Sequence, residues 1–153
     1  MTVRIHATAG AVSLVCIAAF WCASLLSEAI GDPATIALVK AAILYGMALL
    51  IPALALAGGT GFKLAKGWKS GLVQRKVLRM RLAAGNGLLV LVPAAIFLAN
   101  RSAEGALDGT FYAVQAVELA AGATNFVLLG LNMRDGLALR RRRRSKPGLL
   151  AAG

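Results

Sequence analysis

The sequence is poor in the residues that most often build catalytic and metal sites. It holds one histidine, two cysteines and six acidic residues among 153. A single histidine excludes a two-histidine metal site within one chain, and no HExxH or CxxC spacing occurs. A GxSxG elbow and a Walker lysine are also missing. These absences argue against hydrolases, metalloenzymes and nucleotide-binding enzymes, and they favour a protein that is not an enzyme.

The two cysteines do not form a disulfide with each other. Cys16 and Cys22 are six residues apart in one predicted helix, so they lie on different faces and more than a turn apart. We interpret both as small apolar packing residues. The apolar run around them is longer than a signal-peptide core, so we expect this segment to be retained.

Apolar residues, in contrast, are abundant. They make up 59% of the chain, and the mean hydropathy is +0.75, which is too high for an ordinary soluble domain. Four runs are long enough to cross a bilayer, at about residues 9–27, 34–57, 82–99 and 110–133. The sequence therefore predicts an all-α integral membrane protein. Its four-helix transmembrane domain covers residues 1–136 and leaves no room for a soluble domain.

The 17 lysines and arginines are distributed unevenly. Seven lie in the connection 58–81 and seven more follow the last apolar run, whereas Arg101 is the one cation of the other two connections. By the positive-inside rule both termini are cytoplasmic, together with the basic loop 58–81 and a basic, disordered tail over 137–153. We expect these segments to contact anionic lipid headgroups of a bacterial inner membrane, and no nucleic acid.

The last apolar run carries polar residues at helical spacing. Its polar positions and one glycine follow one another at steps of 3, 4, 3 and 7, namely Gln115, Glu118, Gly122, Asn125 and Asn132. On a helix these residues form one narrow stripe. A polar stripe in hydrocarbon must face protein or water, so we expect this helix to organise the bundle.

A first group of polar residues is expected inside the membrane. Lys40 and Glu118 each lie about two turns from the outer face, so an ion pair between them is expected. The predicted intramembrane polar cluster consists of Glu28, Lys40, Gln115, Glu118 and Asn125. Two interpretations stay open for it. One is a structural clasp that fixes helix order, and the other is a small ion- or proton-responsive transport protein that uses Glu118 and Lys40.

A second group is expected at the cytoplasmic ends of the helices, with the members His6, Gly10, Asn86, Asn132, Arg134 and Asp135. The segment Arg4-Ile5-His6, followed by Gly10, resembles the first helix of b-type membrane cytochromes. The resemblance implies an electron-transfer protein that binds haem b, with His6 as an iron ligand and Gly10 admitting the porphyrin. Since His6 is the only histidine, haem would need methionine, another axial ligand, an open site, or His6 of a second subunit. A structural histidine at the interface is the other interpretation.

A wider resemblance covers most of residues 4–136. It rests on the segments RIHATAG, FWCASLLSE, LIPALALAGGTGF, RMRLAAGNGLLVLVPAAIFLA and FYAVQAVELAAGATNFVLLGLNMRDG. The chain resembles a group of small four-span proteobacterial inner-membrane proteins of uncharacterised role, which implies the topology but no activity. We predict a non-enzymatic accessory or interaction protein without a cofactor, which forms a homo-oligomer or binds another membrane protein through small-residue faces.

Overall fold

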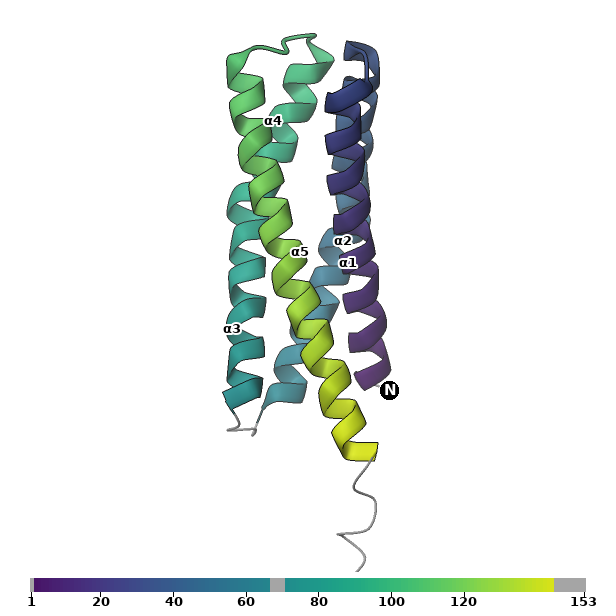
Figure 1. Ribbon diagram of the computed structural model, residues 1–153, viewed down its shortest axis with the longest axis vertical. Coiled ribbons are helices and arrows are strands. Elements are labelled where there is room, and N and C mark those ends of the chain that lie inside the picture. Colours follow the sequence, from purple (N-terminus) through teal and green to yellow (C-terminus); the bar gives the residue numbers. More distant parts are fainter. Residues whose placement is uncertain (1, 67–70, 145–153) are drawn as a thin grey trace, which may run out of the picture.

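The computed structural model describes residues 2–66 and 71–144, without the side chains of residue 72 and of residues 139–144. Of the described residues, 94% are helical and none lies in a strand. The elements are α1 (Thr2–Ile30), α2 (Pro33–Ala65), α3 (Gly71–Asn86), the π-helix η1 (Gly87–Leu91), α4 (Val92–Ala103) and α5 (Gly109–Arg144). The elements α3, η1 and α4 follow one another without a break and form one continuous helical rod. This rod and the rods α1, α2 and α5 run alternately up and down in one bundle (Figure 1).

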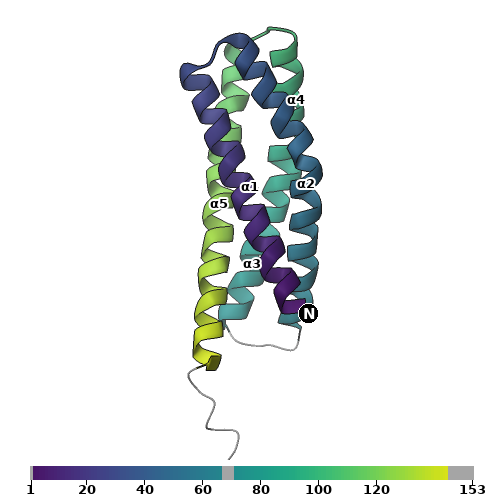
Figure 2. The ribbon, with the colours of Figure 1, turned by 90° about the vertical axis from the view of Figure 1, so that its right-hand side faces the viewer.

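Four helices are long and apolar enough to cross a membrane, namely Thr2–Ile30, Pro33–Ala65, Val73–Ala103 and Gly109–Ala138. This confirms the predicted all-α fold with four candidate spans. Helix α1 packs against α2 and α5, α2 also packs against α3 and α4, and α5 also packs against α3 and α4. Rods that are consecutive in the chain are therefore neighbours around the bundle (Figure 2).

Two aspartates begin helices at one end of the bundle. Asp32 Oδ1 accepts a hydrogen bond of 2.7 Å from the Thr35 amide, with Pro33 at the first helical position of α2. Asp108 Oδ1 accepts one of 3.0 Å from the Phe111 amide at the start of α5. These backbone hydrogen bonds favour the charged carboxylates, so they hold the pKa of Asp32 and the pKa of Asp108 below the usual range.

The helices extend further than the sequence analysis expected. Helix α2 continues to Ala65 and α3 begins at Gly71, so most of the predicted loop 58–81 is helical. The predicted tail 137–153 is likewise helical up to Arg144, while residues 67–70 and 145–153 lie outside the described part. Contacts from other helices stabilise these extensions. His6 of α1 contacts the carbonyl oxygen of Ala57, and Arg79 of α3 pairs with Asp135 of α5.

The π-helix lies directly before Pro93. Proline has no amide hydrogen, and in this wider turn the Val92 amide bonds the Gly87 carbonyl, five residues earlier. Toward the end of the bundle that carries Asp32 and Asp108, Leu98 packs with Ile36 and Phe111 in the apolar core. Three partly buried side chains pack against this core: Phe97, Leu107 and Val114. The outer surface is apolar as well. Val15, Leu38 and Leu89 are between 67% and 75% exposed, as expected for helices surrounded by lipid.

Candidate functional site

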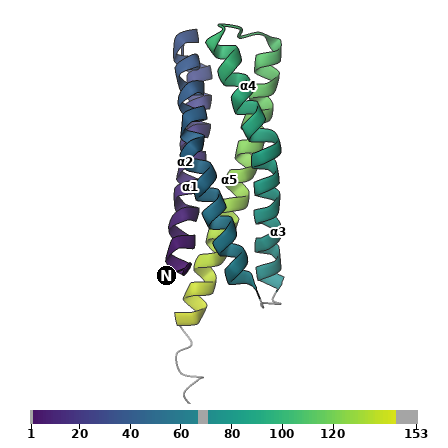
Figure 3. The ribbon, with the colours of Figure 1, turned by 180° about the vertical axis from the view of Figure 1, so that it is seen from behind.

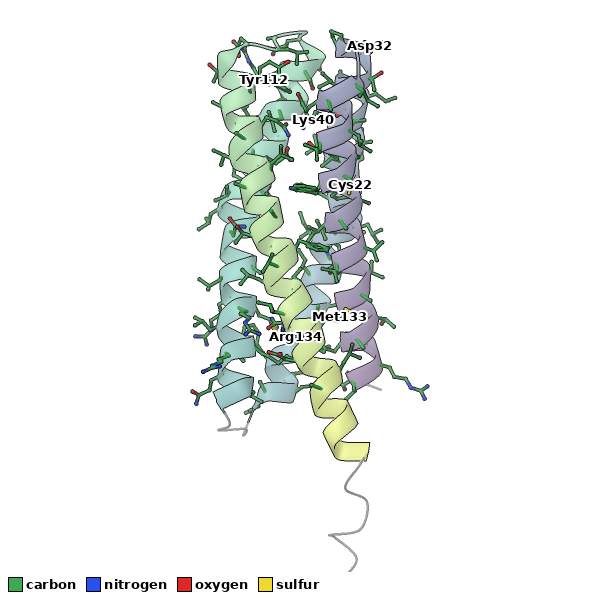
Figure 4. The ribbon with its side chains drawn as sticks, viewed as in Figure 1. Cys22, Asp32, Lys40, Tyr112, Met133 and Arg134 are labelled. Atoms are coloured by element: carbon green, nitrogen blue, oxygen red, sulfur yellow. The ribbon has the colours of Figure 1, made fainter. Side chains whose placement is uncertain are left out.

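A network around Lys40 is the main polar feature of the bundle interior. Lys40 is 2% exposed and lies in the upper part of the bundle in Figure 4, the end that also carries Asp32 and Tyr112. Its Nζ donates hydrogen bonds to Ser24 Oγ and Gln115 Oε1, and a third of 3.3 Å to Glu118 Oε2. An ammonium group has three hydrogens, so this network uses all of them. Residues of α1, α2 and α5 are thereby joined at one point.

Ser24 completes this network. Its hydroxyl accepts from Lys40 Nζ, accepts a 3.0 Å bond from Gln115 Nε2, and donates one of 3.4 Å to Glu118 Oε2. A hydroxyl offers one hydrogen and two lone pairs, so its capacity is fully used. Ser24 is 2% exposed, and the sequence analysis did not include it in the cluster. Its position four residues before Glu28, one helical turn, was the signal that would have identified it.

Glu28 is the member of the cluster that is not hydrogen-bonded. Its Oε1 lies 3.5 Å from Lys40 Nζ, which is ion-pair distance, and its side chain is 12% exposed. Both carboxylate oxygens are buried, and neither has a hydrogen-bond partner among the described residues. Two carboxylates therefore share one ammonium group, and the fully ionised cluster carries a charge of −1 inside the bundle. The predicted pairing of Lys40 with Glu118, Gln115 and Glu28 is present.

Trp21 makes a second link between α1 and α5, which the sequence analysis did not predict. Its Nε1 donates a hydrogen bond of 3.0 Å to the carbonyl oxygen of Leu119. A Cβ atom on Gly122 would lie 3.1 Å from Trp21 Cδ1, so the glycine makes room for the indole ring. The Trp21 side chain thus packs in the interior, between α1 and α5.

The placement of Asn125 and Asn86 in the two predicted groups was wrong, because these residues bind each other. Asn86 Nδ2 donates 2.9 Å hydrogen bonds to Asn125 Oδ1 and to the Ala121 carbonyl. Asn125 Nδ2 donates one of 3.2 Å to the Ala83 carbonyl. These contacts form a separate amide bridge between α3 and α5. Asn125 follows Glu118 by seven residues, about 10 Å along α5, so it shares the face of the Lys40 cluster but not its depth.

At the opposite end, α5 is bound to α3. Arg79 Nη1 donates a 2.7 Å hydrogen bond to Asp135 Oδ2, and Asn132 Nδ2 donates one of 3.2 Å to the Lys76 carbonyl. Arg134 is 72% exposed and lies 3.6 Å from Asp135 Oδ1 (Figure 4). Asn132, Arg134 and Asp135 are therefore close in space as predicted. Arg79, which the prediction did not name, is the closest partner of Asp135.

His6 lies apart from this group and binds α2. Its Nδ1 is 3.0 Å from the Ala57 carbonyl oxygen and 3.3 Å from Thr60 Oγ1. Because a carbonyl only accepts, Nδ1 carries the hydrogen in this contact and Nε2 is the nitrogen left for a ligand. A Cβ on Gly61 would meet His6 Cε1 and Met80 Sδ, each at 3.1 Å, whereas one on Gly10 would meet nothing within 4 Å. Gly61, not Gly10, is thus the glycine that allows close packing at His6.

These features define a class of protein. The bundle has the organisation of a multi-pass membrane protein, with a polar interior and an apolar outer surface. Within the described residues, no group of three His, Cys, Asp or Glu side chains is placed to hold a metal ion. A comparison with protein-family models, curated proteins and solved structures finds no match to this chain.

Proposed function

We propose that the protein is a four-span bacterial inner-membrane protein with both termini in the cytoplasm. In support, the C-terminal part of α2, the N-terminal part of α3 and the C-terminal part of α5 lie at the same end of the bundle (Figure 3). Residues 58–81 and 134–144 of the sequence carry most of the cations. Labelling of single cysteines in intact cells tests this orientation. A cysteine at Glu104 should react with an impermeant maleimide, and one at Gln74 should react only after lysis.

The function that the geometry supports best is that of a non-enzymatic accessory protein that binds other membrane components. The observation that supports this role is that all three hydrogens of the Lys40 ammonium group are donated to acceptors within the chain. A lysine engaged in this way acts as a clasp between helices and is not free for chemistry. The apolar outer faces then serve for contacts with lipid, with a second copy of the chain, or with a membrane-protein partner.

In-membrane crosslinking followed by purification tests the accessory role. We expect a defined partner or a homo-oligomer, and we expect its yield to fall when exposed cations of the segment Phe62 to Arg81 are replaced by glutamine. Replacement of Arg101, a cation at the other end, is the control and should leave the yield unchanged. If no crosslinked species forms in native membranes, the accessory role is wrong.

The surplus carboxylate of the cluster favours one second candidate, a proton-responsive membrane protein. Lys40 directs its hydrogens to Ser24, Gln115 and Glu118, so the buried Glu28 carboxylate has no donor among the described residues. A proton on Glu28 would neutralise the cluster. Reconstituted protein should then take up protons when the external pH falls, and Glu28→Gln or Glu118→Gln should abolish the response without loss of insertion. An unchanged response in both variants would exclude this candidate.

A further inference from the structure

A groove lies between the C-terminal part of α2 and the N-terminal part of α3. These parts of the two helices lie at the end of the bundle where α5 ends (Figure 3). Two adjoining hollows of about 240 and 400 Å³ form the groove, and Ala65 and Val77 line both. This is the size range of sites for small organic groups. The other lining residues are Val73, Gln74, Leu78 and Arg81 in the first hollow, and Phe62, Lys63 and Lys66 in the second.

The chemistry of the groove is that of an anionic amphiphile's binding site. Its walls are mainly apolar, and three cations line it, contributed by both helices: Lys63, Lys66 and Arg81. The Arg81 guanidinium lies 5.9 Å from the centre of the Phe62 ring, which orients it beside the apolar wall. Asp135, an acidic residue at the same end of the bundle, pairs with Arg79 and so does not neutralise these cations.

The depth of the groove matches the headgroup region of a bilayer. At 1.5 Å per residue, Arg81 lies about 33 Å from the end of its rod at Ala103, and Lys63 lies about 45 Å from the start of α2. A hydrocarbon layer is about 30 Å thick and the headgroups add several ångströms on each side. Both positions lie more than about 30 Å from the opposite end of their helices, and Arg81 reaches the Phe62 ring beside Lys63, so the cations of the groove lie together at the level of the headgroups.

We propose that this groove binds one anionic phospholipid of the leaflet at the basic end. The lipid phosphate pairs with Arg81 and the two lysines, and an acyl chain follows the exposed apolar residues Leu82 and Leu89 toward the membrane centre. The site rests on the membrane location proposed above, but not on the direction in which the protein is inserted. Anionic lipid could also be attracted to the basic end by charge alone, without entering the groove. The experiment therefore has to distinguish binding in the groove from this general attraction.

Native mass spectrometry of the full chain in mild detergent measures this binding, with phosphatidylglycerol and phosphatidylcholine as the two probes. We expect one phosphatidylglycerol to bind tightly and phosphatidylcholine to bind on the order of a hundredfold more weakly. Replacement of Lys63, Lys66 and Arg81 by glutamine should weaken phosphatidylglycerol binding by a similar factor, since each cation contributes roughly fivefold. Ala65→Leu, which fills the groove without a change in charge, should also weaken it.

The matched control replaces Arg4, Arg75 and Arg134 by glutamine, which removes the same charge from exposed positions outside the groove. This control should bind phosphatidylglycerol as the unaltered chain does. Equal losses in both triple variants, equal binding of the two lipids, or displacement by inorganic phosphate would each overturn the site. If the groove variant does not fold, the exposed single variant Lys66→Gln should still weaken binding about fivefold. A wrong orientation would appear in the maleimide labelling and leave this result unchanged.

Discussion

The Lys40 cluster gives the sharpest test of how the bundle is held together. Lys40→Met removes the ammonium group but keeps an unbranched side chain of similar length. At 3.3 Å from Glu118, the charge interaction is about 5 kcal/mol in a medium of effective dielectric constant about 20, and the cost of desolvation offsets part of it. The substitution also leaves two buried carboxylates without a cation. We expect the free energy of unfolding to fall by about 3–5 kcal/mol.

The upper limit of this loss is set by protonation. A carboxyl group with an ordinary pKa of about 4.3 takes up a proton at pH 7 at a cost of about 4 kcal/mol, so each of the two carboxylates left without a cation costs no more than about that amount. The loss caused by Lys40→Met should therefore shrink as the pH is lowered toward 4.5. A loss that is independent of pH would mean that shape, and not charge, is what Lys40 provides.

The assay is unfolding in mixed detergent micelles, followed by the fluorescence of Trp21, whose indole packs between α1 and α5. Glu28→Gln is the matched control, because it removes the carboxylate that has no hydrogen bond and leaves the Lys40–Glu118 pair intact. It should lower stability by less than Lys40→Met does, because it leaves a neutral ion pair and no carboxylate without a cation. Adding Glu28→Gln and Glu118→Gln to Lys40→Met should restore most of the loss, since a neutral cluster has no charge to compensate. If Lys40→Met lowers the free energy of unfolding by less than about 1 kcal/mol at pH 7, the Lys40 cluster does not hold the helices together as inferred.

Three further predictions concern other parts of the bundle. Asn86→Leu should destabilise the protein by about 1–3 kcal/mol in the same assay, because it leaves the buried Asn125 Oδ1 without its donor. Asn86→Leu combined with Asn125→Leu should cost less than the sum of the two single losses. The pKa values of Asp32 and Asp108 are lowered, so their charged carboxylates contribute stability above about pH 4 that is lost as the pH falls through the pKa of the folded state. The melting curves of Asp32→Asn and Asp108→Asn should therefore converge with those of the unaltered protein in acid. Protein purified in mild detergent should show no Soret band, and a band that shifts on reduction and disappears in His6→Ala would replace the accessory role with haem binding.

The pairing inside the membrane was predictable because depth and charge both follow from the sequence. Counting residues from Asp32 placed Lys40 at the level of Glu118, and opposite charges in hydrocarbon must meet. What the count does not give is the rotation of each helix or the order of helices around the bundle. Ser24 was within reach of the sequence, since it lies one helical turn before Glu28 on the same face. The acceptor of Trp21 is a backbone carbonyl, which every residue supplies, so no sequence signal marks Leu119.

The error at Asn86 has a different physical cause, which is the position of the helix end. With the third span drawn from residue 82, Asn86 was expected at the cytoplasmic end. The helix begins at Gly71, so Asn86 lies about 22 Å inside the rod, where it reaches Asn125. Cations and glycines between residues 58 and 81 were interpreted as a loop, yet contacts with α1 and α5 keep this stretch helical. Local composition does not contain those long-range contacts.

The arrangement of the Lys40 cluster also bears on how the chain enters the membrane during synthesis. Glu28 and Lys40 belong to helices joined by only Gly31 and Asp32, so they emerge from the ribosome together. If the protein is inserted as proposed, we expect the first hairpin to enter as a pair of opposite charges, without waiting for later segments. Glu118 follows Lys40 by almost eighty residues and would take the third hydrogen of a lysine that is already inside. On this account, the carboxylate that has no hydrogen bond among the described residues is the one that enters the bilayer with Lys40.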